Sequence, residues 1–382
     1  MTFDLDILTP EKELFSGKAE FVAAQAVDGE IGILAGHAPL VSVLGRGAVR
    51  VTLPGGEKKE FPTEQGLIRT AANRVTVLLC LLLCLQAAAP AAKVYVAKTA
   101  DRAEALKALF QNHPLPDLSG KKVIIKPNFN SDDPYPATTH LDTLRFVIRQ
   151  VKAADPASIT ILERSGMGDT DQVLLNRGVY RLVKEEQIKI VNLDKLPARD
   201  WVKRGTEGTH WKEGFLIPRE LLNADYVVNL ACLKTHRFGG DFTLSLKNNV
   251  GLVAKWGGTY NYMWELHTSP SQRLMIAEIN QYIPNHLVII DGLKGFATEG
   301  PEKGRLIEPN IMILSEDRVA ADVVGVGVLR SFGTTPKVMK GRIFDQEQIK
   351  RAAELGVGVK SAEEIELIEL ISRVKPFLST AP

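Results

Sequence analysis

The first 78 residues alternate between hydrophobic and polar positions in short runs. The opening run reads FDLDIL over residues 3–8, and Thr-Pro and Pro-Gly-Gly breaks interrupt the later ones. A period of two is typical of strands that are buried on one face. The pattern predicts strands over 3–8, 18–27, 48–53, 59–61, 66–70 and 74–78. Short strands at this spacing predict an all-β sandwich over residues 1–78.

An apolar run follows, reading VTVLLCLLLCLQAAAPAA over residues 75–92, and residues 75–85 carry no charge. This core has the length of a signal-peptide apolar region and is short for a membrane span. Arg69 and Arg74 precede it, and small residues follow. Two interpretations stay open. Either the run is a signal-like segment that exports the following domain, or a last sandwich strand leads into a buried helix and an alanine- and proline-containing linker, with residues 79–92 as the apolar connection.

From residue 93 onward, apolar runs of strand length alternate with amphipathic helical patterns. Strands are predicted over 94–96, 122–126, 159–162, 188–192, 226–231, 286–291 and 310–314, with helices between them. Terminal helices are predicted over 347–355 and 362–374. This alternation predicts an α/β domain with an open, mostly parallel sheet over residues 93–382. The complete fold prediction is therefore multidomain: an all-β sandwich followed by an α/β domain.

Composition narrows the function classes. A chain of 382 residues is long enough for two or more domains, and its net charge of +2 gives no reason to expect a nucleic-acid partner. Three cysteines supply neither a disulfide framework nor the four thiolates of a usual iron–sulfur cluster, so no such cluster is expected. The pattern identifies no other cofactor.

Four predicted strands end in polar or glycine-bearing loops, at residues 126–128, 165–169, 232–236 and 291–294. The carboxyl ends of parallel strands meet at one edge of a sheet, so these exits are predicted to converge. The densest stretch, residues 224–252, combines cations, amides and hydroxyls suited to a small anionic ligand. If the domain is an enzyme, the predicted chemistry is proton transfer. We assign catalytic roles to Lys234, His236 and Asp291, and ligand binding to Lys126, Asn128, His140, Lys247 and Asn248.

Metal binding is an alternative use of part of this set. His140, His236, His267 and Asp291 are nitrogen and oxygen donors that could form a metal site. None is spaced as a local pair such as HxxxH, so a histidine that orients or protonates the substrate is an equally good interpretation.

The first segment carries four recognisable motifs: LDILTP at 5–10, LFSG at 14–17, GEIGILAGHAPL at 29–40 and NRVTVL at 73–78. Through these motifs it resembles the N-terminal β-sandwich of the epsilon subunit of F-type ATP synthase. This resemblance implies a non-catalytic piece that docks to the gamma subunit and to the ring of membrane subunits. The helical hairpin that follows this sandwich in the family is not found in the sequence after residue 78.

The second segment, residues 121–335, carries KPNF at 126–129, TH at 139–140, LKTH at 233–236, SLKNNVG at 245–251, His267, IDG at 290–292 and GP at 300–301. Through these motifs it resembles the family called domain of unknown function 362. Some relatives carry ferredoxin-like cysteine clusters that this chain lacks, so the resemblance implies no electron transfer. The family name assigns no activity.

Two functions follow as hypotheses. The leading one is an α/β domain that binds, and in one version transforms, a small anionic ligand. The alternative is a non-catalytic rotor component that couples proton transport to ATP synthesis. Both fit a cytoplasmic chain or one peripheral at the inner face of the membrane, whereas the signal-like interpretation of residues 75–92 exports the α/β domain.

Overall fold

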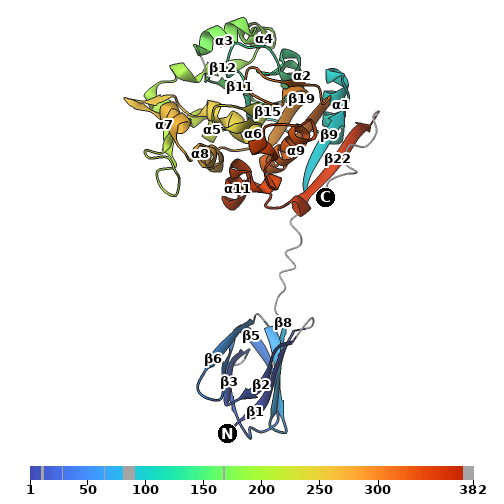
Figure 1. The fold of residues 1–382 in the computed structure, drawn as a ribbon, viewed down its shortest axis with the longest axis vertical. Helices are drawn as coiled ribbons and strands as arrows, with labels where there is room; N and C mark the ends of the chain where they lie inside the picture. The colour runs from blue at the N-terminus through green and yellow to red at the C-terminus, as the bar shows by residue number, and fades with distance from the viewer. Residues whose placement is uncertain (10–12, 28, 64, 81–90, 167, 373–382) are drawn as a thin grey trace. The chain divides into compact units, whose positions relative to one another are not determined.

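The computed structural model describes residues 1–9, 13–27, 29–63, 65–80, 91–166 and 168–372. The chain divides into two compact units, Met1–Pro90 and Ala91–Pro382. Figure 1 draws the first unit in blue as an assembly of strands, and the second as a larger unit of strands and helices. An all-β unit followed by an α/β unit confirms the fold class predicted from the hydrophobic pattern.

The described strands of the first unit pair in the order β2-β1-β8-β7-β5-β3-β4, with β6 against β5. Alternate side chains such as Phe3, Leu5 and Ile7 point into one core, as a period of two requires. Leu5 of β1 and Val22 of β3 share that core although they are far apart in the strand order, so the sheet folds over itself as a sandwich. The strands are β1 (Phe3–Leu8), β2 (Glu13–Ala19), β3 (Phe21–Ala26), β4 (Gly29–Leu34), β5 (Leu40–Thr52), β6 (Lys58–Thr63), β7 (Gln65–Ala71) and β8 (Arg74–Cys80).

The apolar run that follows the sandwich in sequence begins inside this unit. β8 includes residues 75–80, and Val75, Val77 and Leu79 are buried in the sandwich core. Residues 81–90, most of the predicted linker or signal-like segment, lie outside the described residues. In the parts of the chain that the structure describes, no helix is both long enough and apolar enough to cross a membrane.

The second unit is organised on a sheet of order β12-β11-β10-β15-β19-β21-β9-β22. The strands from β12 to β19 are parallel, β21 is antiparallel to β19 and β9, and β22 is parallel to β9. The prediction of a mostly parallel sheet is therefore confirmed. These strands are β9 (Ala92–Lys98), β10 (Lys122–Lys126), β11 (Ser158–Glu163), β12 (Lys189–Asn192), β15 (Tyr226–His236), β19 (Leu287–Phe296), β21 (Ile311–Ser315) and β22 (Ile365–Ser372). The described part of the unit also has six shorter strands. Two of them, β16 and β20, pair with β15 and β19 of the main sheet, and the others form the two-stranded sheets β13-β14 and β17-β18. These strands are β13 (Trp201–Arg204), β14 (Phe215–Pro218), β16 (Asp241–Thr243), β17 (Trp256–Gly257), β18 (Tyr260–Asn261) and β20 (Leu306–Ile307).

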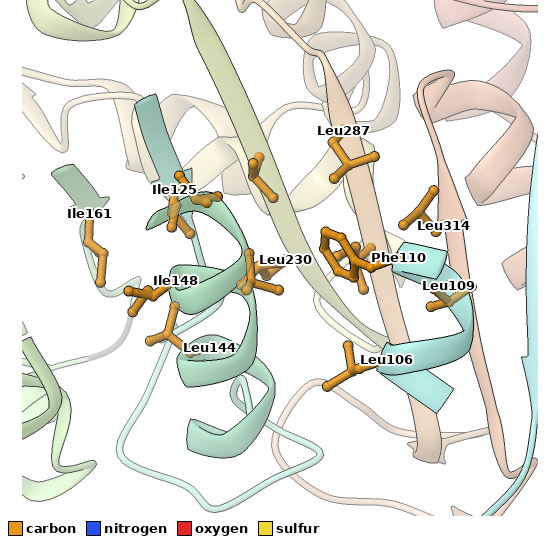
Figure 2. Close-up of a cluster of buried hydrophobic side chains, with 14 of the residues drawn as sticks. Leu106, Leu109, Phe110, Ile125, Leu144, Ile148, Ile161, Leu230, Leu287 and Leu314 are labelled. Atoms are coloured by element: carbon orange, nitrogen blue, oxygen red, sulfur yellow. The ribbon is translucent and has the colours of Figure 1, made fainter. Parts of the chain in front are cut away.

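Helices cover both faces of this sheet. Figure 2 shows Leu106 and Phe110 of α1, and Leu144 and Ile148 of α2, directed at the strands, where they meet side chains such as Leu230. Burying side chains of this size stabilises the fold by about 1.5–3 kcal/mol each. This face carries α1 (Arg102–Asn112), α2 (Leu141–Ala153), α3 (Thr170–Asn176) and α4 (Val179–Glu185).

The opposite face packs against α6 (Ser245–Asn248), α8 (Gln272–Ile279), α9 (Arg318–Ser331), α10 (Pro336–Met339) and α11 (Glu347–Glu354). Neighbours along one strand divide between the two cores: Leu230 belongs to the first and Ala231 to the second. Both faces are thus buried, which explains why the central strands appear in the sequence as continuous apolar runs. Two further short helices of the unit are α5 (Arg219–Leu222) and α7 (Tyr262–Thr268).

Two predicted elements are corrected. The predicted strand over 226–231 continues to His236, so the polar residues 232–236 are in β15 rather than in a loop. The predicted helix over 362–374 was wrong for residues 365–372, which form β22 beside β9. Its sequence, IELIELIS, repeats every three residues and resembles a helix locally, whereas the open edge of β9 supplies hydrogen-bonding partners that only the fold brings near.

Candidate functional site

A cavity of about 490 Å³ lies at the carboxyl ends of the central parallel strands of the second unit. Its walls come from the ends of β10, β11 and β15, from α6 with the following 3-10 turn Asn249–Leu252, and from α7. Ligands bind at this end of the strands in open α/β sheets. The polar lining comprises Lys126, Asn128, Asn130, Glu163, Arg164, Lys234, His236, Thr243, Lys247, Asn248, Asn261 and His267.

Lys126 and Glu163, the last residues of β10 and β11, form a buried ion pair. Lys126 Nζ donates to Glu163 Oε1 at 2.7 Å and to the carbonyl oxygen of Pro127 at 2.5 Å. The Glu163 carboxylate also accepts from the backbone N–H groups of Phe129 and Arg164, both at 2.8 Å. Burial lowers the pKa of Lys126, and the neighbouring Glu163 carboxylate opposes that effect. The charge of Lys126 is therefore largely neutralised by Glu163.

Lys234 is fully buried near the end of β15. Its ammonium donates to Asn128 Oδ1 at 2.8 Å and to the carbonyl oxygen of Ala137. Neither acceptor carries a charge, and burial lowers the pKa of Lys234. A buried cation that has only neutral partners is stabilised by an anion placed beside it.

A chain of five buried asparagine amides runs from Lys234 into the protein. The chain runs in the order Asn128, Asn248, Asn229, Asn249 and Asn280. The Nδ2 of each residue donates to the Oδ1 of the next, at distances between 2.7 and 3.1 Å. Arg318 donates to the last Oδ1 at 2.9 Å. With a cation donating at each end, every amide in the chain has its orientation fixed. The amides of Asn128 and Asn248 are thus engaged in supporting Lys234.

Lys247, in α6, differs from the other two lysines. Its side chain is buried, and its ammonium makes no hydrogen bond or ion pair with any described residue. Burial, together with the charges of Lys234 and Arg164, lowers its pKa to about 7. Gly240 allows this placement, because a Cβ at that position would lie 2.5 Å from Lys247 Cε. Lys247 therefore presents an unpaired donor to the cavity.

Further groups on the cavity wall lack partners among the described residues. His236 Nδ1 and Thr243 Oγ1 are buried without a hydrogen bond. Burial, reinforced by the charge of Lys247, holds the pKa of His236 well below its ordinary value, so this ring is neutral at pH 7. His267 Nδ1 lies 2.7 Å from the carbonyl oxygen of Met263. A carbonyl only accepts, so Nδ1 carries the proton and Nε2 has a free lone pair.

The wall carries more basic than acidic side chains. Arg164 adds a fourth cation, and its guanidinium donates to the carbonyl oxygen of Val250 at 2.6 Å. Burial lowers the pKa of Arg164 to about 10, which leaves it charged at pH 7. Against Lys126, Arg164, Lys234 and Lys247, the lining that the described residues form contains a single carboxylate, Glu163. Such a wall favours anions over neutral or cationic ligands.

Six of the eight predicted site residues line this one cavity: Lys126, Asn128, Lys234, His236, Lys247 and Asn248. Asp291 and His140 do not. Asp291 lies on the face of β19 toward α1 and α2, where it pairs with Arg102 and accepts from Thr143 at 2.7 Å and from Tyr135 at 2.6 Å. His140 caps α2 and contacts the ring of Tyr135. These two residues belong to a separate, internally satisfied cluster.

The four metal-ligand candidates are divided by the same arrangement, because His236 and His267 line the cavity and His140 and Asp291 do not. Among the described residues, no group of three or more histidine, cysteine, aspartate or glutamate side chains is arranged to hold a metal ion. The nearby thiol of Cys232 is buried, and burial raises its pKa to about 11, so it is not a thiolate at neutral pH.

The predicted site omitted five polar residues of the wall: Glu163, Arg164, Thr243, Asn130 and Asn261. A signal was present for the first two, since a charged pair directly follows the apolar run ITIL at 159–162. The more conspicuous glycines at 166 and 168 follow immediately and mask it. Thr243 lies in the polar stretch 224–252 that the sequence singled out, but it was not assigned to the site; the antiparallel pairing of β16 with Lys234 of β15 brings it to the cavity.

Comparison with known proteins identifies two separate segments. The family model described as "Domain of unknown function (DUF362)" matches residues 123–327, and the one described as "ATP synthase, Delta/Epsilon chain, beta-sandwich domain" matches residues 2–80. The ATP synthase epsilon chain of Legionella pneumophila (strain Corby) is 45% identical over 78 residues, which are 20% of this chain and 56% of that protein. The epsilon chain of Caldicellulosiruptor saccharolyticus is 40% identical over 76 residues, 20% of this chain and 55% of that protein. The chain thus spans about half the length of these curated relatives.

Solved structures show the same division. A chain of the Euglena gracilis mitochondrial ATP synthase matches 20% of this chain and 50% of its own length, with 21% identity and a TM-score of 0.20. The lactate racemase apoprotein from Thermoanaerobacterium thermosaccharolyticum matches 60% of this chain and 55% of its own, with 18% identity and a TM-score of 0.38. Likeness at these levels says nothing about chemistry. Both sequence resemblances, to the epsilon sandwich and to domain of unknown function 362, are confirmed by the family models.

Proposed function

Because the chain belongs to the family described as "Domain of unknown function (DUF362)", whose description assigns no activity, we propose a function from the cavity itself. The α/β domain, taken as residues 93–382, binds a small anionic ligand between Lys234, Lys247 and Arg164. The sandwich, taken as residues 1–78, is non-catalytic and is joined to it through the segment 79–92.

The observation that carries this proposal is the unpaired ammonium of Lys247. A cation that is mostly removed from water and has no acceptor destabilises a protein, and a charge-assisted hydrogen bond to a bound anion reduces that penalty. Thr243 Oγ1 is a further unpaired donor on the same wall, so an anion would find two unpaired donors among the described residues there, and His236 Nδ1 is an unpaired ring nitrogen.

If the bound anion is also transformed, proton transfer is the chemistry that the wall supports. His236 is neutral and has a free ring nitrogen, and Lys247 has a pKa of about 7, so both are suited to exchanging a proton with a bound ligand. Lys234 donates to Asn128 and Ala137, which holds its ammonium in place and leaves its third N–H for the ligand, so it is suited to hold charge rather than to move protons. Asp291 has no part in this chemistry, because it does not line the cavity.

Isothermal titration calorimetry with sulfate, inorganic phosphate and acetate tests the binding proposal in the full chain. We expect at least one of these anions to bind, and Lys247→Met to weaken that binding roughly 10- to 100-fold, the range for a lost charge-assisted hydrogen bond. Lys350→Met, which removes an exposed lysine of α11, should leave the affinity unchanged. Equal affinities for wild type and Lys247→Met would refute the site.

A second function concerns the sandwich. Its match to the epsilon β-sandwich family and its 45% identity to an epsilon chain favour docking to the central stalk of an ATP synthase. The test is co-purification of the full chain with the gamma subunit and the membrane ring of the same cell. We expect recovery of gamma by the full chain and its loss when residues 1–78 are deleted. Recovery that is unaffected by the deletion would contradict this function.

A further inference from the structure

The cavity has a second side that the anion proposal leaves without a role. Among the described residues, six lining side chains are apolar or aromatic: Phe129, Phe238, Val250, Met263, Trp264 and Pro301. Trp264 is 70% exposed and Phe238 is 43% exposed, although both are large hydrophobic residues. A single exposed aromatic is ordinary in a protein, but two that line one cavity offer an apolar surface for a ligand to cover.

Local structure fixes the backbone at Trp264 and the ring of Phe238. Asn261 caps the start of α7 by accepting from the Trp264 backbone N–H at 2.8 Å, which fixes the first turn of that helix. Phe238 follows β15 closely in sequence, and the Arg237 guanidinium lies 4.3 Å from its ring centroid. The His236 ring meets it edge-on, with centroids 5.7 Å apart. The contact with His236 joins the aromatic side of the cavity to its polar wall.

The size of the cavity indicates a ligand larger than an inorganic anion. A cavity of about 490 Å³ is far larger than one inorganic anion and lies within the range that small organic molecules occupy, roughly 300–1,000 Å³. Anion-binding donors and apolar side chains occur on one cavity, so a ligand that uses both would carry a charged group and a hydrophobic body.

We propose that the ligand is an aromatic anion, with a carboxylate or phosphate group bound by Lys247 and Lys234 and a ring packed against Trp264 and Phe238. This inference rests on the proposed anion site and specifies its ligand class. The ring–ring contacts add affinity that a bare anion lacks.

Two matched pairs of probes test it by calorimetry on the full chain: phenyl phosphate with inorganic phosphate, and benzoate with acetate. In at least one pair we expect the aromatic member to bind roughly tenfold or more tightly than its partner. The double variant Trp264→Leu/Phe238→Ala should remove that advantage and leave the non-aromatic member unchanged. Trp256→Leu is the control, because Trp256 is 57% exposed but does not line the cavity.

The outcomes separate the two proposals. Equal affinity within both pairs, or an equal loss for both members in the Trp264→Leu/Phe238→Ala variant, overturns the aromatic ligand and leaves the anion site intact. Failure of all four probes to bind wild type overturns both. Binding of the aromatic members that survives Lys247→Met unchanged also overturns the inference, because it shows that the ring binds without the cationic wall.

Discussion

Lys247 is the residue whose replacement should affect stability and binding in opposite directions. Its side chain is buried and its ammonium has no partner among the described residues, so the folded chain holds a charge that is less well solvated than in the unfolded chain. Lys247→Met keeps the length of the side chain and removes that charge. We therefore expect the variant to be more stable than wild type and to bind anions less tightly, as is common at functional sites.

The magnitude follows from the pKa of Lys247, which falls from 10.5 to about 7 on folding. Below pH 7 both states carry the proton, and the folded state bears the full penalty, about 5 kcal/mol at roughly 1.4 kcal/mol per pKa unit. Above pH 7 the folded protein releases the proton while the unfolded chain keeps it, so the penalty shrinks to about 2 kcal/mol at pH 9 and vanishes above pH 10.5. The gain on replacing Lys247 should shrink in the same way.

Urea unfolding at pH 6 and pH 9 measures this difference. All four tryptophans, at positions 201, 211, 256 and 264, lie in the second unit, so their fluorescence follows that unit alone in the full chain. Comparing wild type with Lys247→Met at each pH cancels the titration of other groups, and Lys350→Met controls for loss of an exposed lysine. Two results would contradict the reasoning about Lys247. One is a lower free energy of unfolding for Lys247→Met than for wild type at pH 6. The other is an increase in the free energy of unfolding that is as large at pH 9 as at pH 6.

Three further predictions concern the same wall. Glu163→Leu leaves Lys126 buried without the carboxylate that pairs with it, so it should lower the free energy of unfolding by about 3–5 kcal/mol. The double variant Lys126→Met/Glu163→Leu should lower it much less. Additive effects of the two substitutions in urea unfolding would contradict this prediction. Gly240→Ala places a Cβ 2.5 Å from Lys247 Cε and 3.1 Å from His236 Nδ1, so it should weaken sulfate binding in calorimetry, and unchanged affinity would show that neither side chain needs that space. Sulfate affinity should fall as pH rises from 7 to 9, because Lys247 loses its proton there; Lys247→Met should flatten this dependence, and a profile shared by both proteins would assign it to another group.

The sequence by itself determined the order of architectures and much of the cavity. Alternation with a period of two specified the sandwich, and alternating strands and helices specified a mostly parallel sheet. Parallel strands present their carboxyl ends at one edge, so polar residues at the exits of β10 and β15 had to lie near one another. Lys126, Asn128, Lys234 and His236 follow from that rule alone, and all four line the cavity.

Tertiary structure decided which polar groups are free to meet a ligand. Asp291 also lies at the end of a predicted strand, but Ile289, Asp291 and Leu293 alternate onto the face of β19 that α1 and α2 cover. On that face Asp291 meets a cation and a hydroxyl, those of Arg102 and Thr143, and its charge is balanced there. The strand prediction alone could not show which face Asp291 would take.

The same distinction explains the remaining differences. Whether Lys247 is unpaired, whether Asn248 is held in a chain of amides, and whether residues 365–372 form a strand all depend on partners distant in sequence. The pattern of residues within a segment indicates its secondary-structure propensity and which of its side chains are buried, so these features can be predicted from the sequence. Pairing of charges, amides and strand edges is a property of two segments at once, so only the folded chain determines it.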